Sequence, residues 1–482
     1  MNNGYLKVAA AMPQVFVGGI FQNTQNIKKL IIELNALQVD IAVFPEMCLY
    51  GSSQSSIAAQ NTLINDCEDA LMEIAQFTKN RQVLCVIGLP LRVEDKILNC
   101  AAMIGMGKVW SIIYKSDQKY NFDNITLGDY SIPFSNKALM RCNSDLPINL
   151  AIVIGKDINN IFSTSANIVL NPFSADLEIF DNYYDQIKIL SQNSPKAIIS
   201  VCGTICKTPY ADKSSIIAEC GQILSKGVNQ PIITAEIDIE KITGLRTIAN
   251  QTFSLKENYF IELPLDQDTN FVRKRSYPRL PYANTNNFEK IYQRLTQILY
   301  ELSDNTKKKI ALSQGEHFWM MLSLLLDMCK TYALKSELIT LLLDNKDQDT
   351  LISNSGFEIQ TLKLDEKSQN IKNAYIIDWA QDNDCILLGS IDRTDYLRHR
   401  PCNAHFVNPL INFNKTAIYI MLAQRRKYDN DWANILEQYQ PKLDDIIIDF
   451  FVYHYIDCGL SAQKTKQIAY ETFEDIKKIQ DL

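Results

Sequence analysis

One stretch decides how the first half of this chain folds: Val43-Phe44-Pro45-Glu46-Met47-Cys48-Leu49-Tyr50-Gly51. Its beginning belongs to the apolar run Ile41–Phe44, which is typical of a buried β-strand. A carboxylate just after such a strand, here Glu46, can act as a general base in a crevice. Taken alone, Glu46 is explained as simply by helix capping or by ion pairing. Residues elsewhere in the chain must decide between these interpretations.

Working outward, residues 1–263 alternate short apolar runs with amphipathic stretches. The apolar runs predict strands at Leu6–Ala11, Ile41–Phe44, Val83–Gly88, Cys100–Ile104, Leu150–Ile154, Ile168–Leu170, Ala197–Val201 and Ile232–Ile237. Helical patterns follow several of them, at Asn23–Leu37 and Ala70–Asn80. Buried strands mixed with helices predict a layered α/β domain.

A polar, proline-containing connector is predicted at residues 264–287. Strand and helix patterns then alternate again through residues 288–482. Helices are predicted at Phe288–Leu302 and Phe318–Tyr332, and strands at Lys309–Leu312, Leu338–Leu343, Glu358–Leu362 and Cys385–Leu388. This alternation predicts a smaller parallel α/β domain. Leu443–Tyr455 and Ala462–Lys478 predict a helical tail.

Composition narrows the function classes. The 482 residues carry a net charge of −7, so there is no basic footprint for nucleic acid or for an anionic membrane. The longest apolar run is too short to span a bilayer, and the first residues lack the pattern of a signal peptide. The twelve cysteines have no framework spacing, as expected for reduced thiols. We therefore expect a cytoplasmic protein without nucleic-acid or membrane partners.

Many ordered segments of the first part resemble the nitrilase-like glutaminase domain of glutamine-dependent NAD synthetases. They are Phe44–Gly51, Gly88–Val93, Asn99–Ala101, Gly107-Lys108, Lys115, Asn167–Asn171, Ile216–Gly221 and Ala235–Asp238. The resemblance implies a nitrilase-like four-layer α/β sandwich for residues 1–263. It implies a smaller doubly wound parallel α/β domain of adenine-nucleotide-hydrolase type for residues 288–482. Because this family assembles through the nitrilase-like domain, the resemblance also implies a homo-oligomer.

In this family a Glu, a Lys and a Cys form the catalytic triad, and Glu46 and Lys115 match the first two. The family's Ile-Cys-Glu-Asp segment corresponds to Ile154-Gly155-Lys156-Asp157, which puts Gly155 at the nucleophile position. Glutaminases of this kind attack the amide with a thiolate, and loss of a nucleophile removes almost all of such a route. The segment Ser116–Asp123 also departs from the family's pattern. We therefore expect no glutaminase activity.

A second altered site is predicted at Leu312-Ser313-Gln314-Gly315-Glu316-His317-Phe318. Small residues before a helix let backbone N–H groups approach phosphate, and the resembled family has Ser-Gly-Gly-x-Asp-Ser there. Ser313 and Gly315 are kept, whereas Gln314, His317 and Phe318 replace the second Gly, the acid and the final Ser. From the residues alone, an ordinary structural turn is the competing interpretation.

Two later segments complete the resemblance to a nucleotide site. Leu387–Asp395 corresponds to Gly-Thr-x-Asn-Lys-x-Glu, and Pro409–Thr416 to Pro-x-Gly-Asp-Leu-x-Lys-Thr, with Asn412 in place of an acid. The resemblance implies a vestigial site that contains Ser313, Gly315, Asp395 and Lys415. We expect Asp395 to be the only carboxylate near it, and Phe318 to fill space that phosphate needs.

No metal site is predicted, because the four histidines lack metal-ligand spacing. We expect no cofactor, unless the second domain is active, in which case ATP and Mg²⁺ are required. The sequence thus predicts a catalytically defective paralogue of glutamine-dependent NAD synthetase, and not an active enzyme. Such a protein acts by binding, regulation or scaffolding, with itself or another protein such as an active synthetase as partner. The alternatives are an active ligase that makes NAD from nicotinate adenine dinucleotide with ATP and ammonia or glutamine, and a changed amidase chemistry in the first domain.

Overall fold

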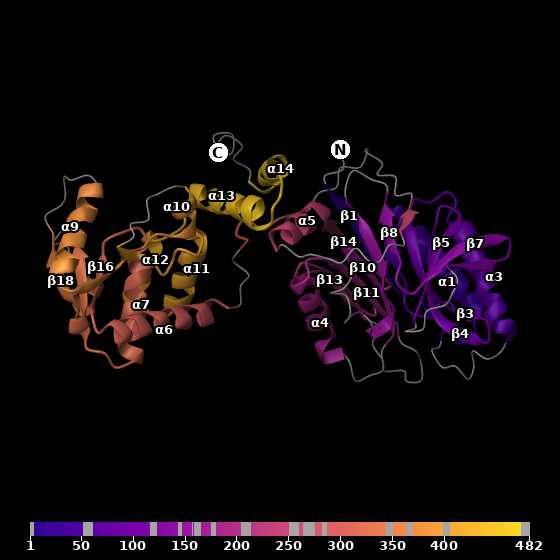
Figure 1. Cartoon of the computed structure of the whole chain (residues 1–482), viewed down its shortest axis with the longest axis horizontal. Helices are drawn as coiled ribbons and strands as arrows, with labels where there is room; N and C mark the ends of the chain where they lie inside the picture. The colour runs from indigo at the N-terminus through magenta and orange to yellow at the C-terminus, as the bar shows by residue number, and fades with distance from the viewer. Residues whose placement is uncertain are drawn as a thin grey trace. The chain divides into compact units, whose positions relative to one another are not determined.

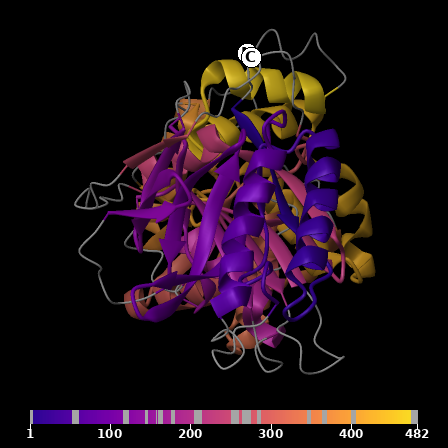
Figure 2. The same ribbon diagram turned by 90° about the vertical axis from the view of Figure 1, so that its right-hand side faces the viewer.

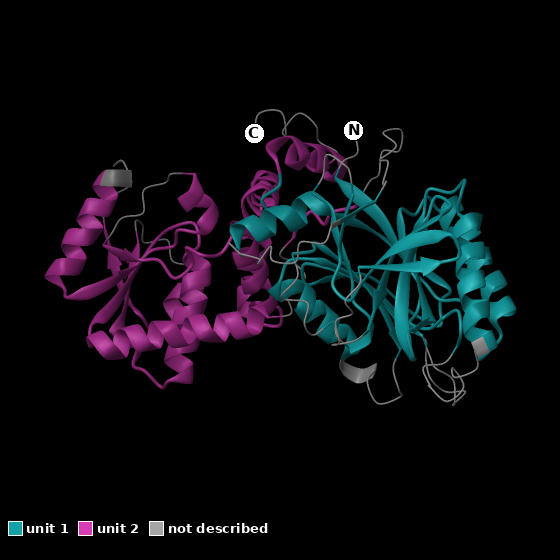
Figure 3. Cartoon of the chain, turned by 45° about the vertical axis from the view of Figure 1, so that its right-hand side comes forward, with its two compact units in different colours: residues 1–275, 458–460 teal, residues 276–457, 461–482 magenta. Residues whose placement is uncertain are grey.

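The computed structural model describes residues 4–51, 61–115, 123–142, 147–156, 158, 165–174, 180–203, 214–249, 260–263, 275–281, 287–343, 350–362, 369–398 and 405–473. The chain divides into two compact units (Figure 1, Figure 3). Unit 1 comprises Met1–Arg275 and Cys458–Leu460, and unit 2 comprises Ser276–Asp457 and Ser461–Leu482. The division after Arg275 falls within the stretch 264–287.

Unit 1 contains two large sheets among its described residues. One has the order β14-β1-β2-β3-β4-β5-β7-β6 and the other β13-β12-β11-β10-β9-β8-β15. The strands of the first sheet are β1 (Tyr5–Ala11), β2 (Ile41–Val43), β3 (Leu84–Val93), β4 (Lys96–Gly105), β5 (Lys108–Tyr114), β6 (Asn124–Leu127), β7 (Tyr130–Ser135) and β14 (Ile232–Asp238). Those of the second are β8 (Leu139–Cys142), β9 (Asn149–Ile152), β10 (Ile168–Ser174), β11 (Ala197–Gly203), β12 (Ser214–Glu219), β13 (Gln222–Val228) and β15 (Phe260–Leu263).

Four layers follow from how the side chains of these strands alternate. Along β1, Ala9 and Ala11 join the core under helices α1 (Ile20–Ala36) and α3 (Asn61–Phe77), which lie beside the strands in Figure 2. The intervening Val8 and Ala10 join a second core, which is shared with strands of the other sheet. A third core lies between that sheet and α4 (Phe180–Asn193). Helix α5 (Ile239–Ile248) follows β14. The predicted four-layer sandwich is confirmed, because the period of two sends alternate residues to opposite faces.

Unit 2 contains a five-stranded sheet with the order β18-β17-β16-β19-β20, in which all neighbouring strands are parallel. Its strands are β16 (Lys309–Ser313), β17 (Ile339–Leu343), β18 (Glu358–Thr361), β19 (Cys385–Leu388) and β20 (Phe406–Val407). Its helices are α6 (Phe288–Thr306), α7 (Phe318–Thr331), α8 (Thr350–Asn354), α9 (Gln369–Asp382), α10 (Arg393–Leu397), α11 (Lys415–Arg426) and α12 (Ala433–Gln438). The parallel α/β prediction is confirmed.

The helical tail contains α13 (Leu443–Phe451), a π-helical turn over Val452–Asp457, and α14 (Ala462–Thr472). The predicted helix over Leu443–Tyr455 therefore changes its hydrogen-bond pattern near residue 452. The last residues of the predicted helix Ala462–Lys478 lie outside the described part of the chain. Within that part, no helix combines the length and apolarity needed to cross a membrane.

Candidate functional sites

Glu46 is held in place by a tight turn directly after β2. The turn closes with hydrogen bonds from the amides of Cys48 to Pro45 and of Gly51 to Met47. Gly88 of β3 lies against it so closely that a Cβ there would meet the backbone of Pro45 and Met47. A glycine at position 88 is thus what lets this turn lie on the sheet, where it buries Glu46 to 5% exposure.

Each oxygen of the Glu46 carboxylate has partners from other strands. Oε1 accepts hydrogen bonds from Lys115 Nζ, at 3.0 Å, and from Asn99 Nδ2. Oε2 accepts one from Ser174 Oγ at 2.8 Å. The Lys115 side chain is 34% exposed, so the buried carboxylate is paired with a cation that reaches solvent. A buried acid fixed from several directions is the expected setting of a positioned base.

Gly155 completes the predicted group of three and lies beside the pair. Its φ of +66° is in the left-handed region that favours glycine. A Cβ at this position would overlap Lys115 Nζ, and would lie 3.1 Å from Lys115 Cε and 3.4 Å from Glu46 Oε2. The structure therefore brings Glu46, Lys115 and position 155 together. The lysine ammonium occupies the space into which a side chain at position 155 would project.

Cysteines from elsewhere in the chain are the candidates for a substitute nucleophile at position 155. Cys48 and Cys142 are buried, and burial raises the pKa of each thiol to about 12. A thiol with such a pKa stays protonated near neutral pH and is a poor nucleophile. Cys202 is buried as well, and Cys206 lies outside the described residues.

A cavity of about 250 Å³ borders Gly155 on the side of α4. Its lining is mostly apolar and includes Phe173, Ile187 and Leu190, with Lys156 among the polar residues. The departure from the family's pattern at Ser116–Asp123 falls mainly on residues 116–122, which are outside the described part of the chain.

In unit 2 the loop after β16 meets the loop after β19. A Cβ at Gly315 would overlap Ser390 Oγ, so the two loops touch at this glycine. Asp392 caps α10 by accepting a hydrogen bond from the amide of Asp395 at 2.8 Å. Of the four residues predicted to form the vestigial nucleotide site, the structure brings three together around these loops: Gly315, Asp395 and Lys415. Ser313 ends β16, and among the described contacts no hydrogen bond or ion pair joins it to Asp395 or Lys415.

Lys415 is the centre of this site. It is the first residue of α11, and its side chain is 4% exposed. Its Nζ lies 2.6 Å from Glu316 Oε1 and 3.5 Å from Asp395 Oδ1. Asp445 Oδ1 follows at 3.7 Å and Asp392 Oδ2 at 3.9 Å. One buried ammonium is therefore surrounded by four carboxylates.

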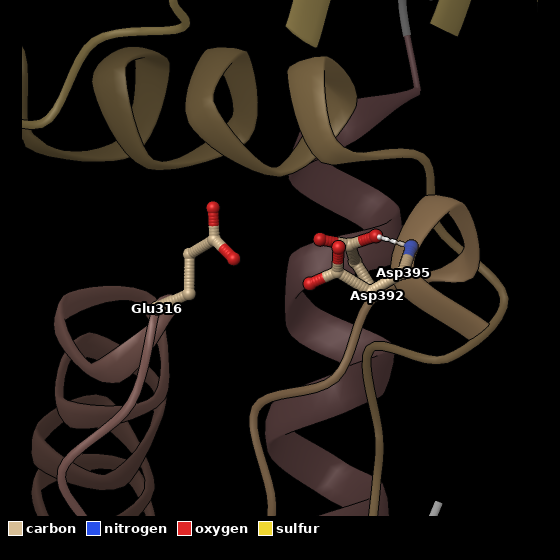
Figure 4. A group of neighbouring side chains, drawn as sticks. All are labelled: Glu316, Asp392 and Asp395. Carbon is tan, nitrogen blue, oxygen red and sulfur yellow. Dashed lines mark hydrogen bonds between the residues drawn. The ribbon is translucent and has the colours of Figure 1, made fainter. Parts of the chain in front are cut away.

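Two expectations about this site are wrong. Asp395 is not the only carboxylate, because oxygens of Glu316, Asp392 and Asp395 lie within 4.8 Å of one another (Figure 4). Phe318 does not fill the loop, because it is buried in the hydrophobic core of unit 2. The Asp392-x-x-Asp395 spacing, which places an N-cap three residues before a second acid, was a usable signal for Asp392. Glu316 had no comparable signal.

His317 is a satisfied core histidine in this arrangement, as its lack of ligand spacing predicts. It is fully buried, with Nε2 2.7 Å from Asp392 Oδ2 and Nδ1 hydrogen-bonded to the hydroxyl of Tyr439. Burial opposes the ionisation of Asp392, but the contacts with His317 and Lys415 hold its pKa below the usual value. Burial also opposes the charge on Lys415, yet the hydrogen bond to Glu316 and the neighbouring carboxylates raise its pKa. Asp392 and Lys415 are therefore held in their charged forms by their neighbours.

Three clustered carboxylates are the donors that Mg²⁺ prefers, so the acids alone would suit a hard divalent cation. Lys415 changes this, because a positive charge already lies within 4 Å of all three. Like charges at such distances repel strongly in a poorly solvated site. With Lys415 in this position the residues do not fit a divalent cation.

Comparisons with solved structures return proteins of known architecture at low identity. A glutamine-dependent NAD(+) synthetase from Cytophaga hutchinsonii aligns over 98% of this chain and 91% of its own, with a TM-score of 0.42 and 12% identity. The glutamine-dependent NAD+ synthetase from Acinetobacter baumannii aligns over 99% and 92%, with a TM-score of 0.40 and 15% identity. An amidase mutant of the nitrilase superfamily from Nesterenkonia aligns over 54% and 98%, with a TM-score of 0.41 and 14% identity.

Comparisons of sequence point to the same family over shorter stretches. No family model matches the chain. The glutamine-dependent NAD(+) synthetase of Mycobacterium leprae is 31% identical over 115 residues, which are 24% of this chain and 17% of that protein. That of Thermotoga maritima is 20% identical over 239 residues, or 45% and 40%. The chain thus matches less than half the length of these relatives. Within those stretches, the chain is homologous to glutamine-dependent NAD(+) synthetases.

Proposed function

We propose that this protein is a catalytically defective relative of glutamine-dependent NAD synthetase that acts by binding, regulation or scaffolding. The observation that carries the proposal is the position of Lys115. Its ammonium overlaps the place where a side chain at position 155 would begin. Thiolate attack on a glutamine amide needs a positioned nucleophile. Position 155 has none, and a side chain there would first have to displace the end of the Lys115 side chain.

The altered synthetase site supports the same proposal. Adenylation needs a divalent cation to neutralise charge on the transferring phosphates. The resembled family has an acid where this chain has Asn412. The carboxylates of Glu316, Asp392 and Asp395 are already paired with Lys415, which would have to move before they could hold such an ion.

The direct test is an assay for each half-reaction with the full chain. Glutamine incubated with the protein should give no glutamate above a buffer control. Nicotinate adenine dinucleotide, ATP, Mg²⁺ and ammonia should give no NAD above the enzyme-free rate. An active glutamine-dependent NAD synthetase run in parallel shows that both assays work. Glutamate release that disappears in Glu46→Gln would overturn the proposal for unit 1.

The second candidate function is an active ligase that makes NAD from nicotinate adenine dinucleotide with ATP and ammonia or glutamine. The observation in its favour is the cluster of Glu316, Asp392 and Asp395, whose oxygens lie within 4.8 Å of one another. For this candidate to hold, Lys415 must leave the cluster when ATP and Mg²⁺ bind. NAD formed from ammonia well above the control would favour the ligase and reject the defective synthetase for unit 2.

We propose in addition that the chain forms a cytoplasmic homo-oligomer and that its partner is a protein, such as an active synthetase. The support is the homology itself. Sedimentation at micromolar concentration should give a species heavier than one chain. Mixing with an active synthetase should change either its sedimentation or its rate. A strictly monomeric species that leaves the synthetase unchanged would contradict this proposal.

A further inference from the structure

Ser174 has an unexplained place in the site of unit 1. It is the last residue of β10 and is partly exposed, while Glu46 is almost fully buried. Its hydroxyl donates to Glu46 Oε2 at 2.8 Å. The same oxygen lies 3.4 Å from the Cβ position of residue 155. Ser174 thus holds the carboxylate oxygen that faces the empty side-chain position.

The other partners of Glu46 keep that oxygen available as a base. Lys115 Nζ and Asn99 Nδ2 both bind Oε1, so Oε2 is left to Ser174. A hydroxyl within hydrogen-bond reach of a base, with the base oriented by a third group, is the diagnostic geometry of an activated nucleophile. Lys115 binds the other oxygen of the same carboxylate, so its positive charge lies beside Glu46 at the oxygen opposite to the one that Ser174 binds. A cation in this place can stabilise an oxyanion that forms at an attacked carbonyl.

From this geometry we infer that Ser174 is a nucleophile for activated esters, with Glu46 as its general base and Lys115 as the oxyanion donor. The inference goes beyond the proposed function, which concerns glutamine and NAD. Activated esters are the expected class because a phenoxide leaves far more readily than an amide nitrogen, so the serine hydroxyl needs less activation to form the acyl-enzyme. The partial exposure of Ser174 and Lys115 leaves both within reach of a small acyl group.

The reaction balances with an ester and water as the reactants. Ser174 Oγ bonds to the acyl carbon while its proton moves to Glu46 Oε2. The bond from the acyl carbon to the leaving oxygen breaks, and that oxygen takes the proton as an alcohol. Water then bonds to the acyl carbon and gives a proton to Glu46. The Ser174 ester bond breaks, Oγ regains the proton, and a carboxylic acid is released.

The experiment treats the full chain with p-nitrophenyl acetate and maps the acetyl group by peptide mass spectrometry. We expect acetyl on Ser174 and a burst of p-nitrophenolate that is lost in Ser174→Ala. Glu46→Gln should slow acylation by roughly 10²–10⁴-fold, as for a lost general base. Ser174→Cys keeps a nucleophile in place and should acylate faster than the wild type. Ser131→Ala, at an exposed serine of β7, is the matched control and should behave as the wild type.

The outcomes separate this inference from a purely structural role and from the proposed function. A serine that merely orients Glu46 gives no acyl adduct. The inference is therefore overturned if the wild type carries no acetyl group on Ser174 and the Ser174→Cys variant carries none on its new cysteine. Acetyl on Lys115 alone assigns the reactivity to the amine and also overturns it. Neither result bears on the proposed function, which fails if glutamine is hydrolysed or if NAD is formed.

Discussion

Lys115 lies in the space that a side chain at position 155 would enter, with its Cε 3.1 Å from the place of the missing Cβ. The lysine is held there by an ion pair, in which Glu46 Oε1 accepts a hydrogen bond of 3.0 Å from its ammonium group. The Lys115–Glu46 ion pair therefore occupies space that is free only because residue 155 is a glycine. The glycine leaves room for the lysine, and a side chain at position 155 would have to displace the end of that lysine.

Gly155→Ala should destabilise the protein more than the same change at Gly18. The two glycines have φ of +66° and +70°, so both substitutions cost about 1–2 kcal/mol for the left-handed conformation. At Gly18 nothing lies within 4 Å of the new Cβ, whereas at Gly155 it must displace Lys115. Urea unfolding of both variants measures the difference. Equal losses would show that Lys115 yields at no cost.

Gly155→Cys should not produce a glutaminase. The new thiol would enter a strained backbone position and compete with Lys115 for Glu46. Lys156, next to it, adds a charge to the lining of the neighbouring cavity. Incubation with glutamine and detection of glutamate tests this, and Gly155→Ser serves as the comparison variant. A covalent glutamyl adduct on the new cysteine would contradict the expectation.

Lys415→Met should convert the cluster of Glu316, Asp392 and Asp395 into a divalent cation site. Removing one partner of a buried charge group costs about 3–5 kcal/mol, because the carboxylates are left uncompensated. A bound Mn²⁺ should restore part of that stability and should be visible by electron paramagnetic resonance, while the wild type shows neither effect. Lys427→Met, in the same helical region but outside the cluster, is the control. Equal Mn²⁺ binding by the wild type would reject the idea that Lys415 blocks the site.

Arg275→Ala should destabilise unit 1 by about 3–5 kcal/mol, because it strips a buried carboxylate of its main partner. Glu219 is fully buried and accepts two hydrogen bonds of 2.8 Å from Arg275, with Lys241 Nζ at 3.3 Å. The exposed pair Arg294–Glu301 offers a matched control, since Arg294→Ala should cost at most about 1 kcal/mol.

The buried pair of Glu219 and Arg275 also predicts that the stability depends on pH. Burial opposes the charge on Glu219, but Arg275 and Lys241 together hold its pKa below the usual value. A lowered folded-state pKa contributes stability above the unfolded-state pKa, and that stability is lost as pH falls through the folded-state pKa. The cost of Arg275→Ala, measured by urea unfolding, should therefore be largest near neutral pH and shrink in acid. A cost that stays constant would contradict the assignment.

The sequence predicted β1–β4, β9–β11, β14 and β16–β19, because their apolar runs carry local information. It did not predict β5–β8, β12, β13, β15 or β20. For example, the apolar run Ile41–Phe44 predicts a buried strand without knowledge of its neighbours. The structure has β2 in this place, with side chains on both faces buried. The alternation of helix and strand patterns after Phe288 predicted the parallel sheet for the same reason. The order of strands in the two large sheets could not be predicted, because it depends on pairings between residues far apart in the chain.

The sequence by itself determined that position 155 has no side chain, and this alone excludes a nucleophile there. It could not determine that Lys115 fills that position, that Ser174 binds Glu46, or that Glu316 and Asp392 join Asp395 around Lys415. Phe318 shows the limit most plainly: its replacement of a small residue suggested a blocked loop, but the side chain packs into the core instead. Residue identity fixes which chemistry a side chain can perform. Its direction and its partners are decided by contacts across strands and loops, which form only when the chain folds.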